Sequence, residues 1–282
     1  MMSQFYNNAK TALLLGLMTG LILAVGSIWG MQGLQIAIIF AAISNIGAYF
    51  FSDKIALASM QAQEVGPDHE LYQIVETLAQ RANLPMPRVY VSPHMAPNAF
   101  ATGRSPNHAA VCATAGLLQM LNRNEIAGVM GHELGHVLHR DMLIQTVAAT
   151  IAGAISFLGY MFYWGGNRRD RDVNPIVLIL TMLLAPIAAS LIQMAISRSR
   201  EFNADQAGAA LSGNPMDLAT ALEKIHAAAN RIPMNVNPAF NSLFIAEPRS
   251  AMQSLATLFA THPPLEKRLL NLIGRESTGM FG

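Results

Sequence analysis

The sequence has little charge for its length. Only 12% of its 282 residues are charged, while 52% are hydrophobic. An average soluble domain has about 25% charged residues. This shortage indicates contact with lipid. The formal net charge is +1 and no run of basic residues stands out, which argues against a nucleic-acid partner.

Cysteine is almost absent as well. The single residue, Cys112, cannot form an internal disulfide. A lone thiol fits a catalytic part that is kept in a reducing compartment. We interpret Cys112 as a small buried side chain.

The N-terminal region has no charge between Thr11 and Ser52. As a helix this run would be about 63 Å long, about twice the roughly 30 Å hydrocarbon core of a bilayer. We therefore predict a helical hairpin that reverses at "WGMQG", Trp29 to Gly33. A cleaved signal peptide with Lys10 as its basic end is the alternative. The apolar stretch is too long for that, and no small-residue cleavage site precedes the second span.

A second pair of apolar spans is predicted at 142–164 and 174–197, separated by a polar loop with three arginines. Between the two pairs, residues 68–84 show helical spacing of apolar residues, and strands are predicted within 87–93, 98–103 and 107–116. Asn124 is the expected cap of the helix that follows. Two further helices are predicted within 214–232 and 262–273, because each segment begins with a proline-containing helix start.

The helix expected after Asn124 carries the chemistry. In "GHELGHVLHRDM", His132 and His136 are four residues apart, so both imidazoles face one point on the helix surface. One metal ion can bind both. Glu133 lies about 100° around the helix from His132, close enough to hold a water molecule as a general base.

Zinc hydrolysis requires a third protein ligand and an open position for water. Glu201, in "SREFNADQAGAAL" directly after the fourth span, is the best candidate. Asp205 follows one turn later and could accept the outer N–H of a ligand histidine. The alternative is a helix whose acids face solvent or pair with Arg198 and Arg200.

The segments "HELGHVLHRD", "EFNAD" and "THPPLEKR", in this order and combined with hydrophobic hairpins, resemble the HtpX family of membrane zinc metalloproteases, relatives of the CAAX prenyl proteases. The resemblance extends along nearly the whole chain. It implies one Zn²⁺ per chain, held by His132, His136 and Glu201, with Glu133 activating water. It also implies that Asn98, Ala99, Phe100 and Ala101 form an edge strand that binds substrate backbone.

The late "HPPLEKR" segment resembles one whose histidine and arginine lie near the active site in that family. His262 could stabilise the oxyanion of peptide hydrolysis, and Arg268 could bind substrate. The alternative, equally favoured, is that the two prolines mark only a helix start and that Arg268 pairs with a structural acid.

From these observations we predict a mainly α integral membrane protein with a small β-sheet, four hydrophobic helices and a zincin-like catalytic domain. The expected parts are a transmembrane hairpin at 1–52, a first catalytic part at 53–141, a second hairpin at 142–197 and a second catalytic part at 198–282. If His132 and Glu201 bind one ion, the segment between them crosses the bilayer an even number of times. A modest bias of basic residues favours a catalytic domain in the cytoplasm.

The expected function is an endopeptidase of the bacterial inner membrane that cleaves misfolded or damaged membrane proteins. The quality-control role rests on the resemblance alone. A protease that processes prenylated proteins, and a non-catalytic membrane scaffold or holdase, are the two alternatives. The sequence does not indicate an oligomeric state.

Overall fold

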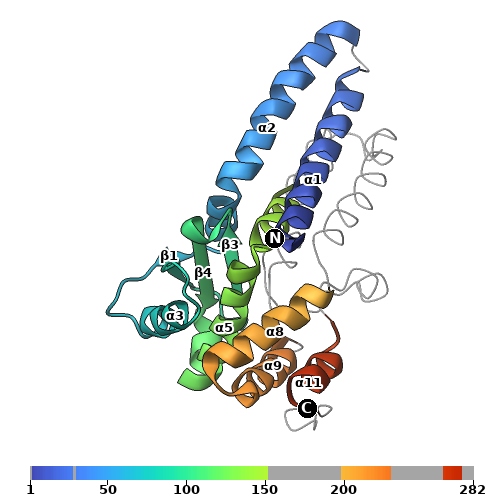
Figure 1. The fold of residues 1–282 in the computed structure, drawn as a ribbon. Coiled ribbons are helices and arrows are strands. Elements are labelled where there is room, and N and C mark those ends of the chain that lie inside the picture. The colour runs from blue at the N-terminus through green and yellow to red at the C-terminus, as the bar shows by residue number, and fades with distance from the viewer. Residues whose placement is uncertain (1, 28–29, 152–197, 230–262, 275–282) are drawn as a thin grey trace, which may run out of the picture.

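The computed structural model describes residues 2–27, 30–151, 198–229 and 263–274. Two long helices form a hairpin that projects from a body containing the sheet and the other helices (Figure 1). Much of the predicted second hairpin, residues 152–197, lies outside the described residues.

The N-terminal hairpin is formed by α1 (Met2–Ser27) and α2 (Gly30–Ser59). The two helices are as predicted, but most of the segment from Trp29 to Gly33, where we expected the reversal, lies in α2. Helix α2 already begins at Gly30, which has a positive φ of 69°. Gly33 lies instead at a helix contact, because a Cβ on Gly26 would come within 2.8 Å of the Gly33 carbonyl oxygen. The second glycine therefore serves close packing of the two helices rather than the turn.

Among the helices that the structure describes, α2 is long and apolar enough to cross a membrane. Shorter apolar helices occupy Asn8–Ala24, within α1, and Met142–Ile151. The Met142–Ile151 helix packs against α1, where Leu14 contacts a buried cluster containing Ile144 and Val147. Three of the four predicted hydrophobic helices are thus represented among the described residues, one of them only in its first turns.

The body begins with α3 (Glu70–Arg81), the predicted amphipathic helix, whose buried face includes Leu71, Ile74 and Val75. The strands are β1 (Gln63–Glu64), β2 (Arg88–Ser92), β3 (Ala99–Gly103) and β4 (Ala109–Thr114), with a 3-10 turn at Pro106–His108 before β4. They form one sheet in the order β1-β2-β4-β3. Strands β2 and β4 are parallel, while β1 and β3 are antiparallel to their neighbours.

Alternation along the strands divides the sheet into two buried faces. Val89 and Val111 face a core that is shared with α3 and the metal-motif helix. Phe100 and Cys112 face the other way and contact Met60, just beyond the end of α2. The sheet therefore lies between the C-terminal end of α2, called its foot below, and the pair formed by α3 and the metal-motif helix.

The remaining elements are α4 (Ala115–Met120), α5 (Arg123–His139), α8 (Arg198–Ser212), α9 (Pro215–Ala229) and α11 (Leu265–Ile273). The two helices predicted after residue 214 are confirmed. Helix α9 contributes Leu218, Leu222 and Ile225 to the main core. Helices α8, α9 and α11 lie together on the side of α5 opposite the sheet (Figure 1).

Candidate metal centre

Helix α5, which carries both histidines, begins two residues earlier than expected. Its cap is Asn122, not Asn124: the Asn122 side chain accepts hydrogen bonds from the backbone N–H groups of Asn124 and Glu125. The Glu125 carboxylate accepts one from the Asn122 N–H in return. Glu125 is also held by Lys224 of α9, at 2.7 and 2.8 Å. The reciprocal pair satisfies more of the free N–H groups at the helix start than Asn124 could alone.

Glycines allow α8 to approach α5 closely enough to complete the site. A Cβ on Gly208 of α8 would lie 2.8 Å from the His132 backbone nitrogen. A Cβ on Gly131 of α5 would lie 3.0 Å from the Gly208 carbonyl oxygen. Any larger side chain at these positions would separate the helices. The close approach brings Glu201, in the first turn of α8, beside the histidines of α5.

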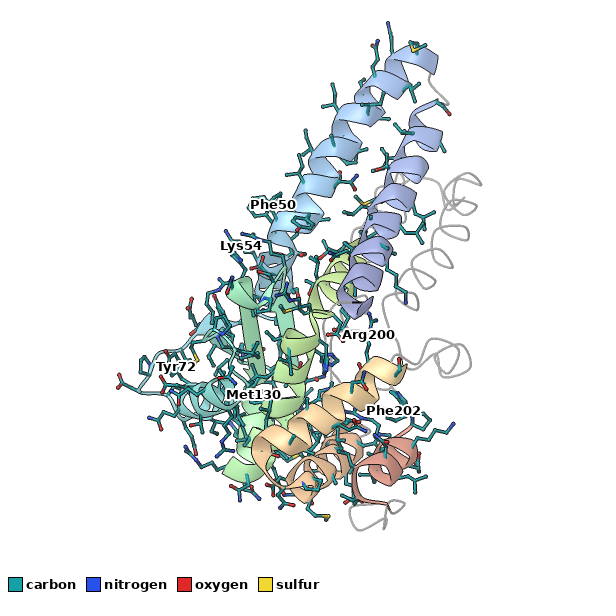
Figure 2. The ribbon with its side chains drawn as sticks, in the orientation of Figure 1. Phe50, Lys54, Tyr72, Met130, Arg200 and Phe202 are labelled. Atoms are coloured by element: carbon teal, nitrogen blue, oxygen red, sulfur yellow. The ribbon has the colours of Figure 1, made fainter. Side chains whose placement is uncertain are left out.

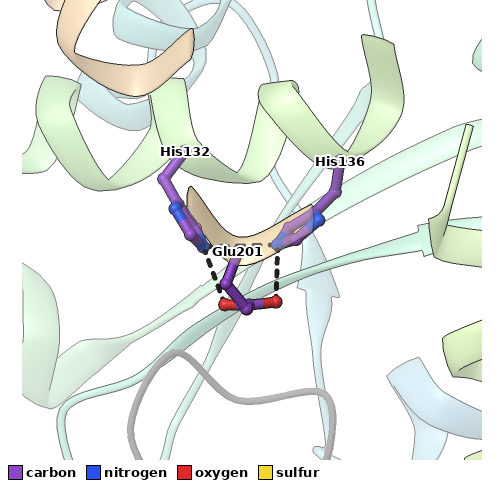
Figure 3. A group of neighbouring side chains, drawn as sticks. All are labelled: His132, His136 and Glu201. Atoms are coloured by element: carbon purple, nitrogen blue, oxygen red, sulfur yellow. Dashed lines mark hydrogen bonds and ion pairs between the residues drawn. The ribbon is translucent and has the colours of Figure 1, made fainter. Parts of the chain in front are cut away.

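His132, His136 and Glu201 converge on one point, although Glu201 lies 65 positions after His136 (Figure 3). The two Nε2 atoms are 3.2 Å apart. The Glu201 carboxylate faces both rings, with one oxygen 3.8 Å from the His132 Nε2 and the other 3.6 Å from the His136 Nε2. All three side chains are buried. The predicted grouping of these residues in one donor set is therefore what the geometry shows.

In both histidines the Nδ1 atom, which is directed away from the shared point, faces a carboxylate. The His132 Nδ1 lies 2.9 Å from Asp205, the partner expected from the sequence. The His136 Nδ1 lies 3.1 Å from Asp141, which the sequence reading did not identify. A carboxylate accepts a hydrogen bond, so each Nδ1 carries a proton, and each Nε2 is the nitrogen that faces the shared point.

Asp141 reaches His136 because the chain reverses sharply after α5. Arg140 ends the helix in the left-handed conformation, with a φ of 57°. The Asp141 N–H then donates to the His136 carbonyl oxygen, at 3.2 Å. The only signal for this in the sequence is an acid shortly after the second histidine, at a spacing that a continuous helix would place off the ligand face.

Arg268 of α11 is buried and binds Asp205 through two hydrogen bonds, at 2.9 Å from Nε and 2.5 Å from an outer nitrogen. The pairing with a structural acid, one of the two alternatives for this residue, is thus present. Burial alone would raise the pKa of Asp205, but Arg268 and the hydrogen bond from His132 lower it overall. Asp205 therefore stays ionised and keeps the proton on the Nδ1 of His132.

The site has an excess of negative charge. Burial would lower the pKa of His136, but the neighbouring carboxylates, Asp141 foremost, raise it to about 10. Two arginines face the rings' carboxylates: Arg268 binds Asp205, and the Nε of Arg200 lies 3.8 Å from Asp141. They are outnumbered by four buried carboxylates, Glu133, Asp141, Glu201 and Asp205. A divalent cation would offset this charge and displace the ring proton, since metal binding requires neutral imidazole.

The donor set fits a zinc ion. Ligands at about 2.0 to 2.2 Å in tetrahedral arrangement lie about 3.3 to 3.6 Å from one another. The two Nε2 atoms, 3.2 Å apart, are close to that spacing, and with one carboxylate oxygen of Glu201 the three donor atoms lie within 4.8 Å of one another. Two imidazoles and one carboxylate are also a ligand set that catalytic zinc sites use.

The structure describes all but one of the remaining predicted site residues. Asn98 is buried, and Ala99, Phe100 and Ala101 lie in β3, at one edge of the sheet. Strand β3 packs beside α5, so this edge is close to the histidine helix. Glu133 is buried on α5 next to His132. His262 lies outside the described residues.

Comparison with known proteins agrees with this geometry. The sequence profile of peptidase family M48 matches residues 66–276, which include every residue of the donor set. The chain belongs to peptidase family M48. Proteins described as "Protease HtpX homolog" from Nostoc punctiforme and Burkholderia cenocepacia (strain HI2424) are each 50% identical to it. The first match covers 96% of both chains, and the second covers 98% of this chain and 99% of the relative.

A solved structure shares the fold. The crystal structure of S. mikatae Ste24p matches with a TM-score of 0.51 at 20% identity, over 96% of this chain and 66% of that longer chain. Membership of family M48 and the close HtpX relatives make this protein a membrane metalloprotease that hydrolyses peptide bonds. The resemblance to the HtpX family that the motifs indicated is confirmed.

Proposed function

We propose that the protein is a zinc-dependent endopeptidase of a bacterial inner membrane, with one Zn²⁺ per chain and its catalytic part facing the cytoplasm. Its substrates are misfolded or damaged membrane proteins. The observation that carries the proposal is the convergence of two imidazole nitrogens and one carboxylate on a single buried point. That arrangement is costly without a cation, because the four surrounding carboxylates repel one another.

Zinc bound by His132, His136 and Glu201 would act as a Lewis acid that lowers the pKa of a water molecule to about 7. Glu133 follows His132 on α5 and would accept a proton from the attacking water and return it to the leaving amine. Asp205 and Asp141 hold the rings so that each Nε2 stays directed at the shared point.

Substrate backbone is proposed to add to the sheet at β3. The position of β3 at the sheet edge, beside α5, supports this, since an added strand would lie next to the histidine helix. Asn98 to Ala101 would supply the backbone groups. His262 is proposed as a donor to the oxyanion. Arg268 is proposed to hold Asp205, and through it the His132 ring, and also to bind substrate.

The same geometry supports the proposed membrane arrangement. Because α5 and α8 meet at one site, the chain between them must return to the side from which it left, which supports two crossings or none. Basic residues near the apolar segments support the cytoplasmic side: Lys10, Lys54, Arg140, Arg198 and Arg200. We expect a reporter fused at the C-terminus to be active only if it functions in the cytoplasm.

The decisive experiment compares the purified wild-type protein in detergent with Glu133→Gln, measuring zinc content and casein cleavage. We expect about one zinc per chain in both proteins and a loss of cleavage of at least about 10²-fold in the variant. Glu76→Gln, an exposed acid on α3, is the matched control and should keep both properties. Full cleavage by zinc-loaded Glu133→Gln would contradict the mechanism.

Two further measurements address the alternatives. A scaffold or holdase would function without stoichiometric zinc and would survive chelation. A prenyl-processing protease would cleave a prenylated C-terminal peptide and leave an unmodified membrane-protein segment intact. For the quality-control role, we expect a damaged membrane protein to accumulate in cells that contain only Glu133→Gln.

A further inference from the structure

A cavity separate from the metal centre lies at the foot of α2. It measures about 580 Å³ and is bounded by the last apolar turns of α2, the segment before β2 and the loop between β3 and β4. Phe50 and Lys54, two of its lining residues, project from α2 where that helix meets the body (Figure 2). None of its lining residues belongs to the donor set.

The cavity has two cations without carboxylate partners. Arg88 is neutralised by Asp53, at 2.9 Å. Lys54 and Arg104 also line the cavity, and within the described part of the chain neither forms an ion pair. Each lies near an aromatic ring at 5.4 Å, Lys54 over Phe51 and Arg104 over Phe50. The cavity therefore has a net positive charge and holds its cations beside apolar rings.

The position of the cavity along α2 matches the surface of a bilayer. The uncharged part of α2, from Gly30 to Ser52, is about 34 Å long, close to the roughly 30 Å hydrocarbon core. Asp53 and Lys54 would then lie at the level of the lipid headgroups. Ile46, Phe50 and Phe51 have exposed side chains, at 57%, 47% and 49%, and would lie at the level of the acyl chains.

The backbone conformation at Gly103 fixes the direction of the loop that supplies Arg104. Gly103 at the end of β3 has a φ of 128°, and a Cβ there would lie 2.1 Å from the His108 carbonyl oxygen. Only glycine fits this turn, which directs Arg104 toward Phe50 on α2. Residues from two parts of the chain, 50 positions apart, thus form one charged and aromatic site.

We propose that this cavity binds a phospholipid with an anionic headgroup. The lipid phosphate contacts Lys54 and Arg104, and the acyl chains lie against Ile46, Phe50 and Phe51. An anionic lipid is favoured over a zwitterionic one because Asp53, the carboxylate that lines the cavity, is already paired with Arg88 and leaves no partner for a headgroup amine. Binding would tie the loop after β3 to the bilayer surface.

The test measures lipid binding to the full-length protein in detergent by native mass spectrometry. The probes are phosphatidylglycerol, phosphatidylcholine with the same acyl chains, diacylglycerol and inorganic phosphate. We expect phosphatidylglycerol to bind most tightly. Lys54→Gln combined with Arg104→Gln should weaken its binding about 25-fold, since each cation near an anionic lipid surface contributes about fivefold. Binding of phosphatidylcholine should change little.

The matched control is Arg81→Gln combined with Arg123→Gln, which removes the same charge from exposed positions on α3 and α5. This control should keep wild-type lipid binding. Equal affinity of the wild-type protein for phosphatidylglycerol and phosphatidylcholine would overturn the proposal, as would an equal loss in the control. Tighter binding of inorganic phosphate than of phosphatidylglycerol would show a site for free phosphate instead. None of these measurements depends on zinc or on proteolysis.

Discussion

The Nδ1 atom of His136 lies 3.1 Å from a carboxylate oxygen of Asp141, a residue that has already left the helix on which the histidine stands. This contact fixes the ring from the side opposite the shared point of the donor set. Together with the matching contact between His132 and Asp205, it means that both histidines of the donor set are oriented by buried acids.

Asp141→Asn should weaken zinc binding by about 10- to 100-fold, because the amide removes the negative charge that orients the ring and raises its basicity. The measurement is competition for zinc with a chromophoric chelator in detergent. Asp68→Asn, an exposed acid before α3, should leave the affinity unchanged. Unaltered affinity in Asp141→Asn would show that the contact does not act on the ligand.

Arg268→Met should destabilise the fold by about 3 to 5 kcal/mol, because it leaves the Asp205 carboxylate buried without its cation. The measurement is thermal or denaturant unfolding of the zinc-free protein. Combining it with Asp205→Asn should recover much of the loss, since the buried charge is then gone. If the double variant is as unstable as the sum of both single variants, the two residues are not energetically coupled.

Gly208→Ala should lower both stability and zinc content. The added methyl group would lie 2.8 Å from the His132 backbone nitrogen, so α8 must move away from α5 and carry Glu201 with it. We expect a cost of about 1 to 3 kcal/mol. Ala210→Ser on the exposed face of α8 is the control. Full zinc content and stability in Gly208→Ala would contradict the importance of the close helix contact.

The grouping of the candidate ligands could be predicted from the sequence, but much of what positions them could not. His132 and His136 are recognisable because helical spacing alone brings them together, and Glu201 because its acid motif follows an apolar span. The roles of Asp141 and Gly208 depend on a left-handed residue after α5 and on the approach of two distant helices. Neither feature has a local pattern in the sequence.

The residue that caps α5 could not be predicted from its type alone either, although it lies close to the histidines in the sequence. Both Asn122 and Asn124 are suitable caps by residue type. Asn122 is the cap because it alone has Glu125 three residues later, which allows the reciprocal bond, and because Lys224 from α9 holds that glutamate in place. For α2, Gly33 was expected in a turn and lies in a helix contact, since glycine suits both.

Cys112 should resist alkylation in the folded protein, even at pH 8.5. Its side chain is fully buried between the sheet and the foot of α2, and burial raises the pKa of the thiol well above its usual range. The neutral thiol therefore favours the folded state below about pH 8.5, and this contribution is lost as the pH rises further. Mass spectrometry after iodoacetamide treatment should detect labelling only in denaturant. Rapid labelling of the native protein would contradict the buried position.

Helix α2 continues without a break from its apolar part to Ser59, and the residues at its end are packed against the sheet. With α2 across the bilayer as proposed, this rigid helix would fix the distance between the lipid surface and the metal centre. Only peptide bonds at that distance from the bilayer surface would then reach the metal centre. Peptide bonds that an intact membrane protein holds closer to the bilayer, or inside it, would not. Selection of damaged substrates would require no recognition of their sequence, only the displacement of a segment by the correct distance.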